Sequence, residues 1–259
     1  MLSLRRGLIP FLLLFAAAAL SAQSPAPPPD TDALARHAID VLGGPSWDKA
    51  RYFAYTLNVD RNGARSGSFP QRWDRFTGDY RVSGRDQQGR EFLVVMNTKT
   101  KQGKGFLNGV EATGKDLEAL LDLGFRRYNN DTYWLLMPFK LTDPGGHRTE
   151  QGERHQDDHT YDVVRVAFDA GDQYWAWINR ENGVVEQWEM KLQGAREEDP
   201  PVTVRFLDFK RPGGMMISTR REVVGKNQTV SLDDLQVAAV VPKDAFVVPK
   251  DASPSPAKP

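Results

Sequence analysis

The stretch Gln173–Gln193, QYWAWINRENGVVEQWEMKLQ, indicates how this chain of 259 residues folds. In the half that follows the turn Asn182-Gly183, apolar and polar side chains alternate. An Asn-Gly pair between two strand-like runs is a strong hairpin signal. The stretch therefore predicts two antiparallel strands, Gln173–Asn179 and Val184–Gln193.

Similar short runs, separated by turn residues, extend in both directions along the chain. Asn62-Gly63 and Pro212-Gly213-Gly214 mark further hairpins. Because the links between runs are short, we expect an antiparallel sheet of about ten strands, which would curl strongly or close into a barrel. The other expected strands are Tyr52–Asp60, Gln71–Phe76, Asp79–Ser83, Glu91–Asn97, Gly103–Leu107, Asp162–Phe168, Val202–Lys210, Met215–Val223 and Thr229–Val237.

Helical spacing of apolar residues occurs near the N-terminus and in the middle of the chain. A first helix is capped by Asp30 or Thr31 and stopped by Gly43-Gly44-Pro45. These helices need a surface for their apolar faces, and the concave side of a curled sheet provides one. The expected fold class is mainly β (α+β): an unclosed antiparallel β-barrel or strongly curved sheet with helices covering its concave side.

Two helices are expected in the middle of the chain. Thr113 and Asp116 have the spacing of a capping box, and apolar residues continue at helical spacing to Tyr128. Asn130-Asp131 can cap a second, short helix that runs through Met137 and is ended by Pro138.

The domain organisation follows from composition. Residues 1–22 have the basic start, apolar stretch and small residues of a cleaved signal peptide, so we expect export to the periplasm. Residues 23–29 are a Pro-rich disordered leader, residues 30–250 a single domain, and residues 251–259 a disordered tail. No later segment approaches the length of a membrane span, so no stable membrane insertion is expected.

Charge and cysteine content exclude several classes of function. Without the signal peptide the chain has 32 basic and 34 acidic residues, which gives no electrostatic case for a nucleic acid partner. The chain has no cysteine, which excludes disulfides, thiol catalysis, Cys-ligated metals and an N-terminal lipoprotein anchor.

Motifs for catalysis are also missing. There is no GxSxG, HExxH, phosphate-binding loop or GxGxxG after a strand, so we predict that the protein is not an enzyme and needs no cofactor. His155 and His159 would share a face if helical, but the acidic residues around them indicate a polar turn. Arg221 and Glu222 are interpreted as charges on the surface of the sheet.

Large apolar side chains are concentrated in two places. Residues 133–139, YWLLMPF, form a dense apolar segment at the end of the helical region. In the strand 173–179, Trp175 and Trp177 share one face, while Tyr174, Ala176 and Ile178 share the other. A strand that is apolar on both faces needs two covers. These residues are therefore either plain core or the wall of an apolar ligand cavity.

Several segments occur in an order that is typical of one group of exported proteins. They are residues 128–145 (YNNDTYWLLMPFKLTDPG), 161–164 (YDVV), 172–179 (DQYWAWIN), the turn 182–183, residues 185–189 (VEQWE) and 213–221 (GGMMISTRR). With them the chain, over roughly Leu34–Pro249, resembles the superfamily of periplasmic lipoprotein carriers, the LolA/LolB-like proteins that include the outer-membrane lipoprotein-sorting factors. It is most similar to a secreted branch of that superfamily.

The resemblance implies an unclosed barrel whose cavity, plugged by helices, holds a hydrophobic ligand or the acyl chains of a lipoprotein client. Binding and release would be non-covalent, and the protein would be a monomer. The carriers hold their helical cover with an arginine on a strand. Arg72, Arg75 and Arg81 are the strand arginines considered for this role, and the resemblance matches none of them to it. The alternative is a protein-interaction or envelope-sensing module on the same fold, with an envelope protein as partner. Candidate ligand-binding residues are Tyr133, Trp134, Met137, Phe139, Trp175, Trp177 and Trp188.

Overall fold

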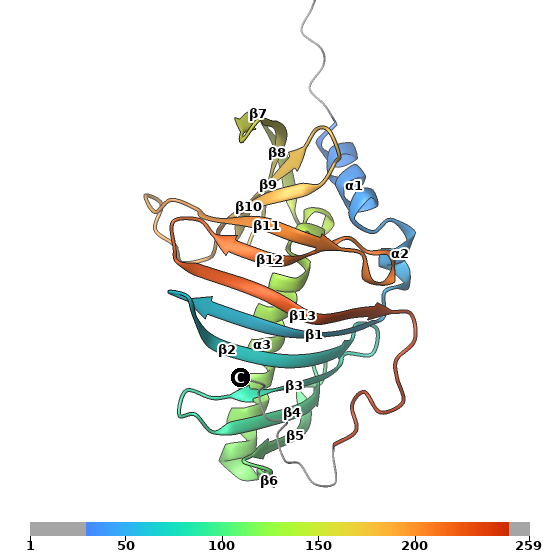
Figure 1. The fold of residues 1–259 in the computed structure, drawn as a ribbon, viewed down its shortest axis with the longest axis vertical. Coiled ribbons are helices and arrows are strands. Elements are labelled where there is room, and N and C mark those ends of the chain that lie inside the picture. The colour runs from blue at the N-terminus through green and yellow to red at the C-terminus, as the bar shows by residue number, and fades with distance from the viewer. Residues whose placement is uncertain (1–29, 249–259) are drawn as a thin grey trace, which may run out of the picture.

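The computed structural model describes residues 30–248, and in them 13 strands form one antiparallel sheet (Figure 1). The spatial order is β6-β5-β4-β3-β2-β1-β13-β12-β11-β10-β9-β8-β7, so β6 and β7 are the two edges and the sheet is not closed. The strands are β1 (Tyr52–Arg61), β2 (Ala64–Asp74), β3 (Asp79–Arg85), β4 (Glu91–Asn97), β5 (Gln102–Leu107), β6 (Val110–Glu111), β7 (His147–Gln156), β8 (His159–Ala167), β9 (Gln173–Asn179), β10 (Val185–Lys191), β11 (Val202–Lys210), β12 (Ile217–Val223) and β13 (Gln228–Ala238).

Tight turns explain why neighbours in sequence are neighbours in the sheet. Asn62 and Gly63 both have left-handed backbone, with φ of 51° and 77°, as a two-residue hairpin that matches strand twist requires. The pairing of β1 with β13 is the exception, because it joins the first and last strands of the sheet. The expected hairpins and the mainly β fold class are confirmed.

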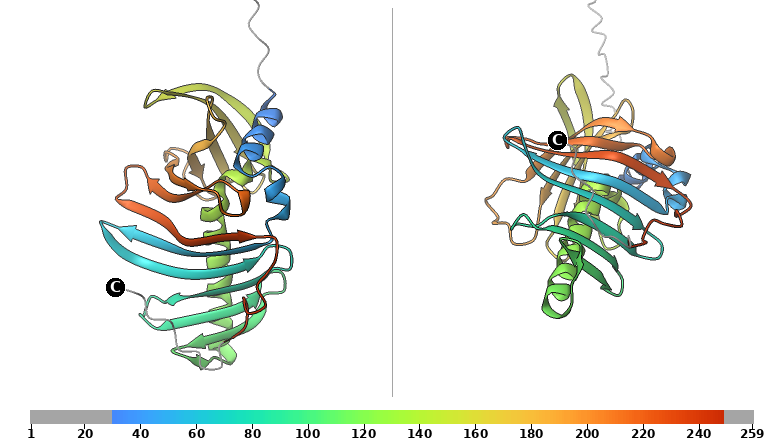
Figure 2. Two further views of the ribbon diagram at one scale, coloured as in Figure 1. Left: turned by 45° about the vertical axis from the view of Figure 1, so that its right-hand side comes forward. Right: turned by 60° about the horizontal axis from the view of Figure 1, so that its bottom comes forward.

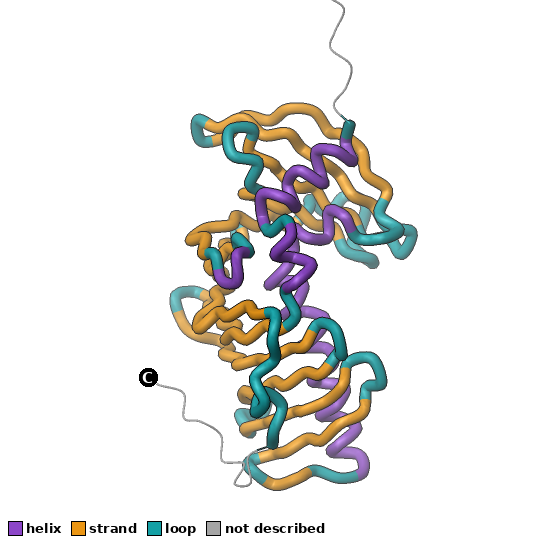
Figure 3. Tube along the Cα trace, turned by 90° about the vertical axis from the view of Figure 1, so that its right-hand side faces the viewer, coloured by secondary structure: helices purple, strands orange, loops and turns teal. Residues whose placement is uncertain are grey.

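The helices are α1 (Thr31–Leu42), α2 (Pro45–Lys49) and α3 (Gly114–Leu136), followed by the 3-10 helices η1 (Met137–Thr142) and η2 (Pro212–Gly214). Figures 2 and 3 show the strands curving around α3, which runs across them on the concave side. The main hydrophobic core lies between this helical layer and the concave face of the sheet. Between residues 30 and 248, no helix combines the length and the apolar character that crossing a bilayer requires.

The prediction of two central helices is wrong, because α3 is continuous through Asn130 and Asp131. The Asp131 carboxylate caps nothing: it is buried in mid-helix and accepts hydrogen bonds from side chains of the sheet and of its own helix. The capping box is also wrong, since the Thr113 side chain makes no capping hydrogen bond.

The expected elements do not include α2, β7 or β6, and the 3-10 helix η1 continues beyond Pro138, where the helix was expected to end. The short helix α2 begins at Pro45, which was interpreted only as a helix stop. The edge strand β7 consists mostly of polar residues and therefore lacks the apolar alternation of a strand. The pairing of β7 with β8 places His155 and His159 on either side of the tight turn Asp157-Asp158. The two-residue strand β6 is too short to give a sequence signal.

Two glycines let α3 lie close to β4 and β5. A Cβ on Gly124 of α3 would come 2.7 Å from Val94 Cγ1 of β4, and a Cβ on Gly105 of β5 would come 2.7 Å from Leu120 Cδ1 of α3. Contacts this short leave no room for a methyl group. The first half of α3 is therefore seated directly on the strands, whereas its end leads into η1, which contacts α1.

Candidate functional site

A small pocket lies where the end of α3 and η1 meet β11 and β12. Its volume is about 10 Å³, roughly the space that the centre of one water molecule needs. The walls are apolar apart from one serine and one arginine. They consist of Leu42, Leu135, Pro138, Phe139, Phe206, Phe209, Met216, Ile217, Ser218 and Arg221.

Arg221 of β12 is the charged group of this pocket, and its side chain is buried, with 1% of its surface exposed. Its Nη2 donates a hydrogen bond of 3.2 Å to the carbonyl oxygen of Leu135, in the last turn of α3. Its Nε and Nη1 have no hydrogen-bond partner among the residues that the structure describes. The guanidinium carbon lies 5.8 Å from the centre of the Phe206 ring.

The environment of Arg221 is electrostatically unfavourable for a cation. Burial lowers the pKa of the guanidinium to about 9, and Tyr55 opposes this shift. The group is still protonated at neutral pH. A buried cation without an anionic partner costs several kcal/mol, because its lost hydration is not replaced. The chain thus keeps a charge beneath the end of α3 at a cost to stability.

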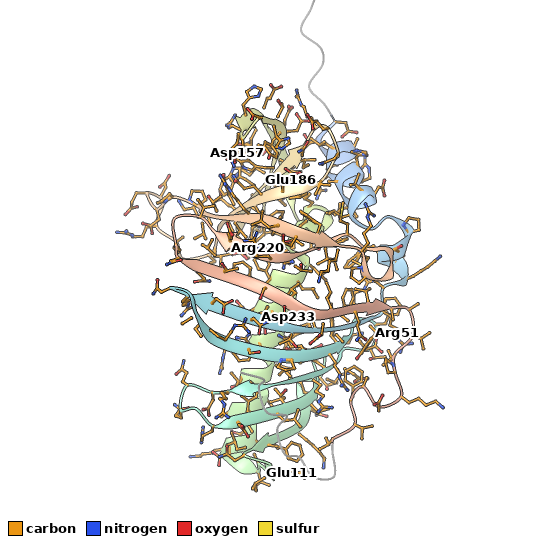
Figure 4. All side chains as sticks on the ribbon, viewed as in Figure 1. Arg51, Glu111, Asp157, Glu186, Arg220 and Asp233 are labelled. Atoms are coloured by element: carbon orange, nitrogen blue, oxygen red, sulfur yellow. The ribbon has the colours of Figure 1, made fainter. Side chains whose placement is uncertain are left out.

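The interpretation of Arg221 as a surface charge is wrong. Within β12, Ile217, Arg221 and Val223 share the concave face, whereas Arg220 lies on the outer face (Figure 4). The surface pair is formed by Arg220 and Glu222. Strand alternation was the signal that could have found this, since it places Arg221 on the same face as Ile217 and Val223 and Arg220 on the other.

The three arginines considered for holding the helical cover bind elsewhere. Arg72 Nη1 donates to the Ala245 carbonyl at 3.1 Å, and Arg81 Nη1 donates to the Val247 carbonyl at 3.2 Å, so both hold the C-terminal segment on the outer face. Arg75 donates to carbonyls at α2 and just after it. Of these four, Arg221 is the arginine that donates a hydrogen bond to α3.

A second contact point fixes the middle of α3 to the sheet. Asp131 is fully buried and forms a salt bridge with Arg127 one turn earlier, at 2.6 Å. Gln71 of β2 donates to Asp131 Oδ2 and accepts from the hydroxyls of Tyr55, at 3.1 Å, and Tyr80. Burial raises the pKa of the Asp131 carboxyl above its usual range, and the Arg127 cation opposes the rise. We call Gln71, Tyr55, Tyr80, Arg127 and Asp131 the Asp131 network.

Five of the seven candidate residues lie on the concave side. Trp188 is fully buried, and its Nε1 donates to the Tyr133 hydroxyl at 2.9 Å, which ties β10 to α3. Met137 is buried in the same core, and half-buried Trp134 packs against it. Phe139 lines the pocket beside Arg221 and stacks on Trp47, with ring centres 4.5 Å apart.

The other two candidates, Trp175 and Trp177, lie on the opposite face of β9. Their neighbours Tyr174, Ala176 and Ile178 belong to the concave core, so alternation turns the two indole rings outward. Trp177 packs edge-on against Tyr161, at 5.7 Å between ring centres. The structure therefore does not bring these two residues together with the other five.

No protein-family model matches this sequence, and comparison with curated proteins gives no match. Among solved structures, the chain is similar to a DUF1329 family protein from Desulfovibrio piger, with 14% identity, 84% of this chain and 97% of that chain covered, and a TM-score of 0.48. A LolA superfamily protein from Nitrosomonas europaea has 14% identity and a TM-score of 0.46, and the match covers 84% of this chain and 97% of that chain. The lipoprotein LppX from Mycobacterium tuberculosis has 10% identity and a TM-score of 0.31, and the match covers 79% of this chain and 96% of that chain.

Of these three, the Nitrosomonas europaea protein is the one named as a LolA superfamily protein. All three have 14% identity or less and TM-scores below 0.5, so nothing about function follows from them.

Proposed function

We propose that the protein is a periplasmic carrier that binds a lipid, a lipoprotein acyl chain or another hydrophobic molecule on its concave side and releases it again. The observation that carries this proposal is the apolar pocket beneath the end of α3, where Arg221 donates a hydrogen bond to the Leu135 carbonyl. Binding and release of this kind need no covalent step and no cofactor.

The closed pocket has room for about one water centre, so an acyl chain requires movement of its walls. The movable part is the end of α3 with η1. The middle of α3 is held by the Asp131 network, and its first half is seated on the strands through Gly105 and Gly124. Each methylene that leaves water would contribute about 0.8 kcal/mol to binding.

The proposed location rests on the sequence of residues 1–22, which lie outside the described residues, as do the leader and the tail. The proposed client is a hydrophobic molecule or a lipoprotein, bound by a monomer. The alternative remains a module of the same fold that binds an envelope protein, and the same experiment distinguishes the two.

The test is to express the full chain with its N-terminal segment, purify the protein from periplasm under mild conditions, and record native mass spectra. Lipid adducts identified by organic extraction support the carrier. We expect Trp134→Ala, on the concave side, to weaken lipid retention, and Trp175→Ala, on the outer face, to leave it unchanged. A lipid-free protein whose tryptophan fluorescence ignores added lipids, and which co-purifies with an envelope protein, would support the alternative.

A further inference from the structure

We propose that the Arg221 pocket binds the anionic head group, carboxylate or phosphate, of a single-chain amphiphile whose acyl chain occupies the apolar walls around it. This inference rests on the proposed function and names the class of ligand. The concave side of the sheet would then select ligands by charge as well as by apolar surface.

The hydrogen-bonding state of the guanidinium favours an anion. Arg221 has one acceptor, the Leu135 carbonyl, and leaves Nε and Nη1 unpartnered within the described part of the chain. A carboxylate or phosphate has oxygens that match the fork of a guanidinium and supplies the missing negative charge. A neutral hydroxyl or ester accepts a hydrogen bond but leaves the buried charge uncompensated.

The protein itself offers no competing anion in the pocket. None of its lining residues is acidic. The other polar wall residue, Ser218, already has backbone partners. Its hydroxyl oxygen accepts from the Leu207 NH at 3.1 Å, and its one O–H donates to the carbonyl of Leu207, at 2.7 Å, or to that of Arg220, at 2.8 Å. Arg221 is therefore the group in this pocket that is free to recognise a head group.

The walls have the character that an acyl chain requires. Asp208 has a left-handed φ of 52°. The register of β11 with β12 is the same on both sides of it, and Phe206 and Phe209, which flank it, both line the pocket. Phe209 and Met216 are half-buried and form an apolar rim, whereas Arg221 lies fully buried. This order, from an apolar rim to a cation inside, fits an amphiphile that enters with its head group towards Arg221.

The head group would also reach the hydrogen bond between Arg221 and the end of α3. Because Nη2 of Arg221 holds the Leu135 carbonyl, an anion that takes this donor removes the hydrogen bond at the end of α3. Occupation of the pocket would then be coupled to release of the helix end, which makes room for the acyl chain.

The experiment measures dissociation constants of the delipidated protein, from tryptophan fluorescence, for three probes below their micelle concentrations. Monopalmitoylglycerol is the neutral probe, monopalmitoylglycerol phosphate has the same chain with a phosphate, and palmitate carries a carboxylate. We expect at least one anionic probe to bind about tenfold or more tightly than the neutral one, a difference of about 1.4 kcal/mol. The anionic probe with the lower dissociation constant identifies the head group.

Two arginines on one strand provide matched variants. Arg221→Met should abolish the preference for the anion, and Arg220→Met, on the outer face, should retain it. Arg221→Lys keeps the charge without the fork and should retain part of the preference, which covers the case in which Arg221→Met misfolds. Circular dichroism establishes that each variant is folded.

The outcomes separate this inference from the proposed function. Equal binding of neutral and anionic probes by the wild type would overturn the head-group site and leave the carrier standing. An anion preference that persists in Arg221→Met would assign the effect to other basic residues and would also overturn it. If none of the three probes binds, both the head-group site and the proposed carrier fail.

Discussion

Replacement of Arg221 by methionine should make the protein more stable. The lowered pKa of about 9, compared with 12.5 for an ordinary guanidinium, corresponds to a cost of about 4–5 kcal/mol for keeping this side chain charged in the folded state. Arg221→Met removes that cost but also loses the charged hydrogen bond to Leu135, which contributes about 1.5–3 kcal/mol. The net gain is about 2 kcal/mol.

Urea unfolding at neutral pH, followed by circular dichroism, measures this gain, and a thermal melt should rise by about 4–8 °C. Arg221→Lys keeps a buried cation and should show no gain. Arg220→Met changes an exposed ion pair and should alter the free energy of unfolding by about 0.5 kcal/mol or less. If Arg221→Met unfolds more easily than the wild type, Arg221 is a net stabilising contact and is not kept for binding at a cost to stability.

Three further predictions concern the seating of α3. Gly124→Ala should destabilise the protein by about 1 kcal/mol in urea unfolding, since overpacking against Val94 outweighs the gain in helix propensity. Tyr133→Phe leaves the buried Trp188 Nε1 without its acceptor and should cost about 1–3 kcal/mol, measured the same way; an unchanged midpoint would contradict this contact. Because the folded-state pKa of Asp131 is raised, its contribution is largest at low pH and is lost as the pH rises through that pKa. The wild type should therefore lose stability relative to Asp131→Asn between acidic and neutral pH, and a constant difference across that range would refute the assigned direction.

The cost of Arg221 has a functional interpretation. Proteins commonly keep residues that lower stability where binding requires them. Here the destabilising side chain, Arg221, is also the donor of the hydrogen bond to the Leu135 carbonyl. A ligand that neutralises its charge would therefore compete for this hydrogen bond. A more stable Arg221→Met variant that no longer distinguishes anionic from neutral amphiphiles would link the two properties directly.

Local sequence determined much of the sheet. Turn residues such as Asn62-Gly63 can adopt left-handed backbone, and alternating runs such as Glu91–Asn97 have the period of a strand, so both signals act over a few residues and can be recognised without the fold. The same holds for α1, where Asp30 accepts hydrogen bonds from the backbone NH groups of Asp32 and Ala33. Alternation also assigns Trp175 and Trp177 to the face of their strand opposite Tyr174, but it does not determine which face is concave.

The tertiary structure decided the central helix and the site. Asn130-Asp131 has the local chemistry of a helix cap, but Gln71, far away in the sequence, provides Asp131 with a hydrogen bond inside the core, so the helix continues. Arg221 has the local chemistry of a surface residue, yet closure of β12 against the end of α3 buries it and leaves it without an anion. Periodicity assigns a residue to one face of its strand, whereas burial and pairing depend on what the rest of the chain places against that face.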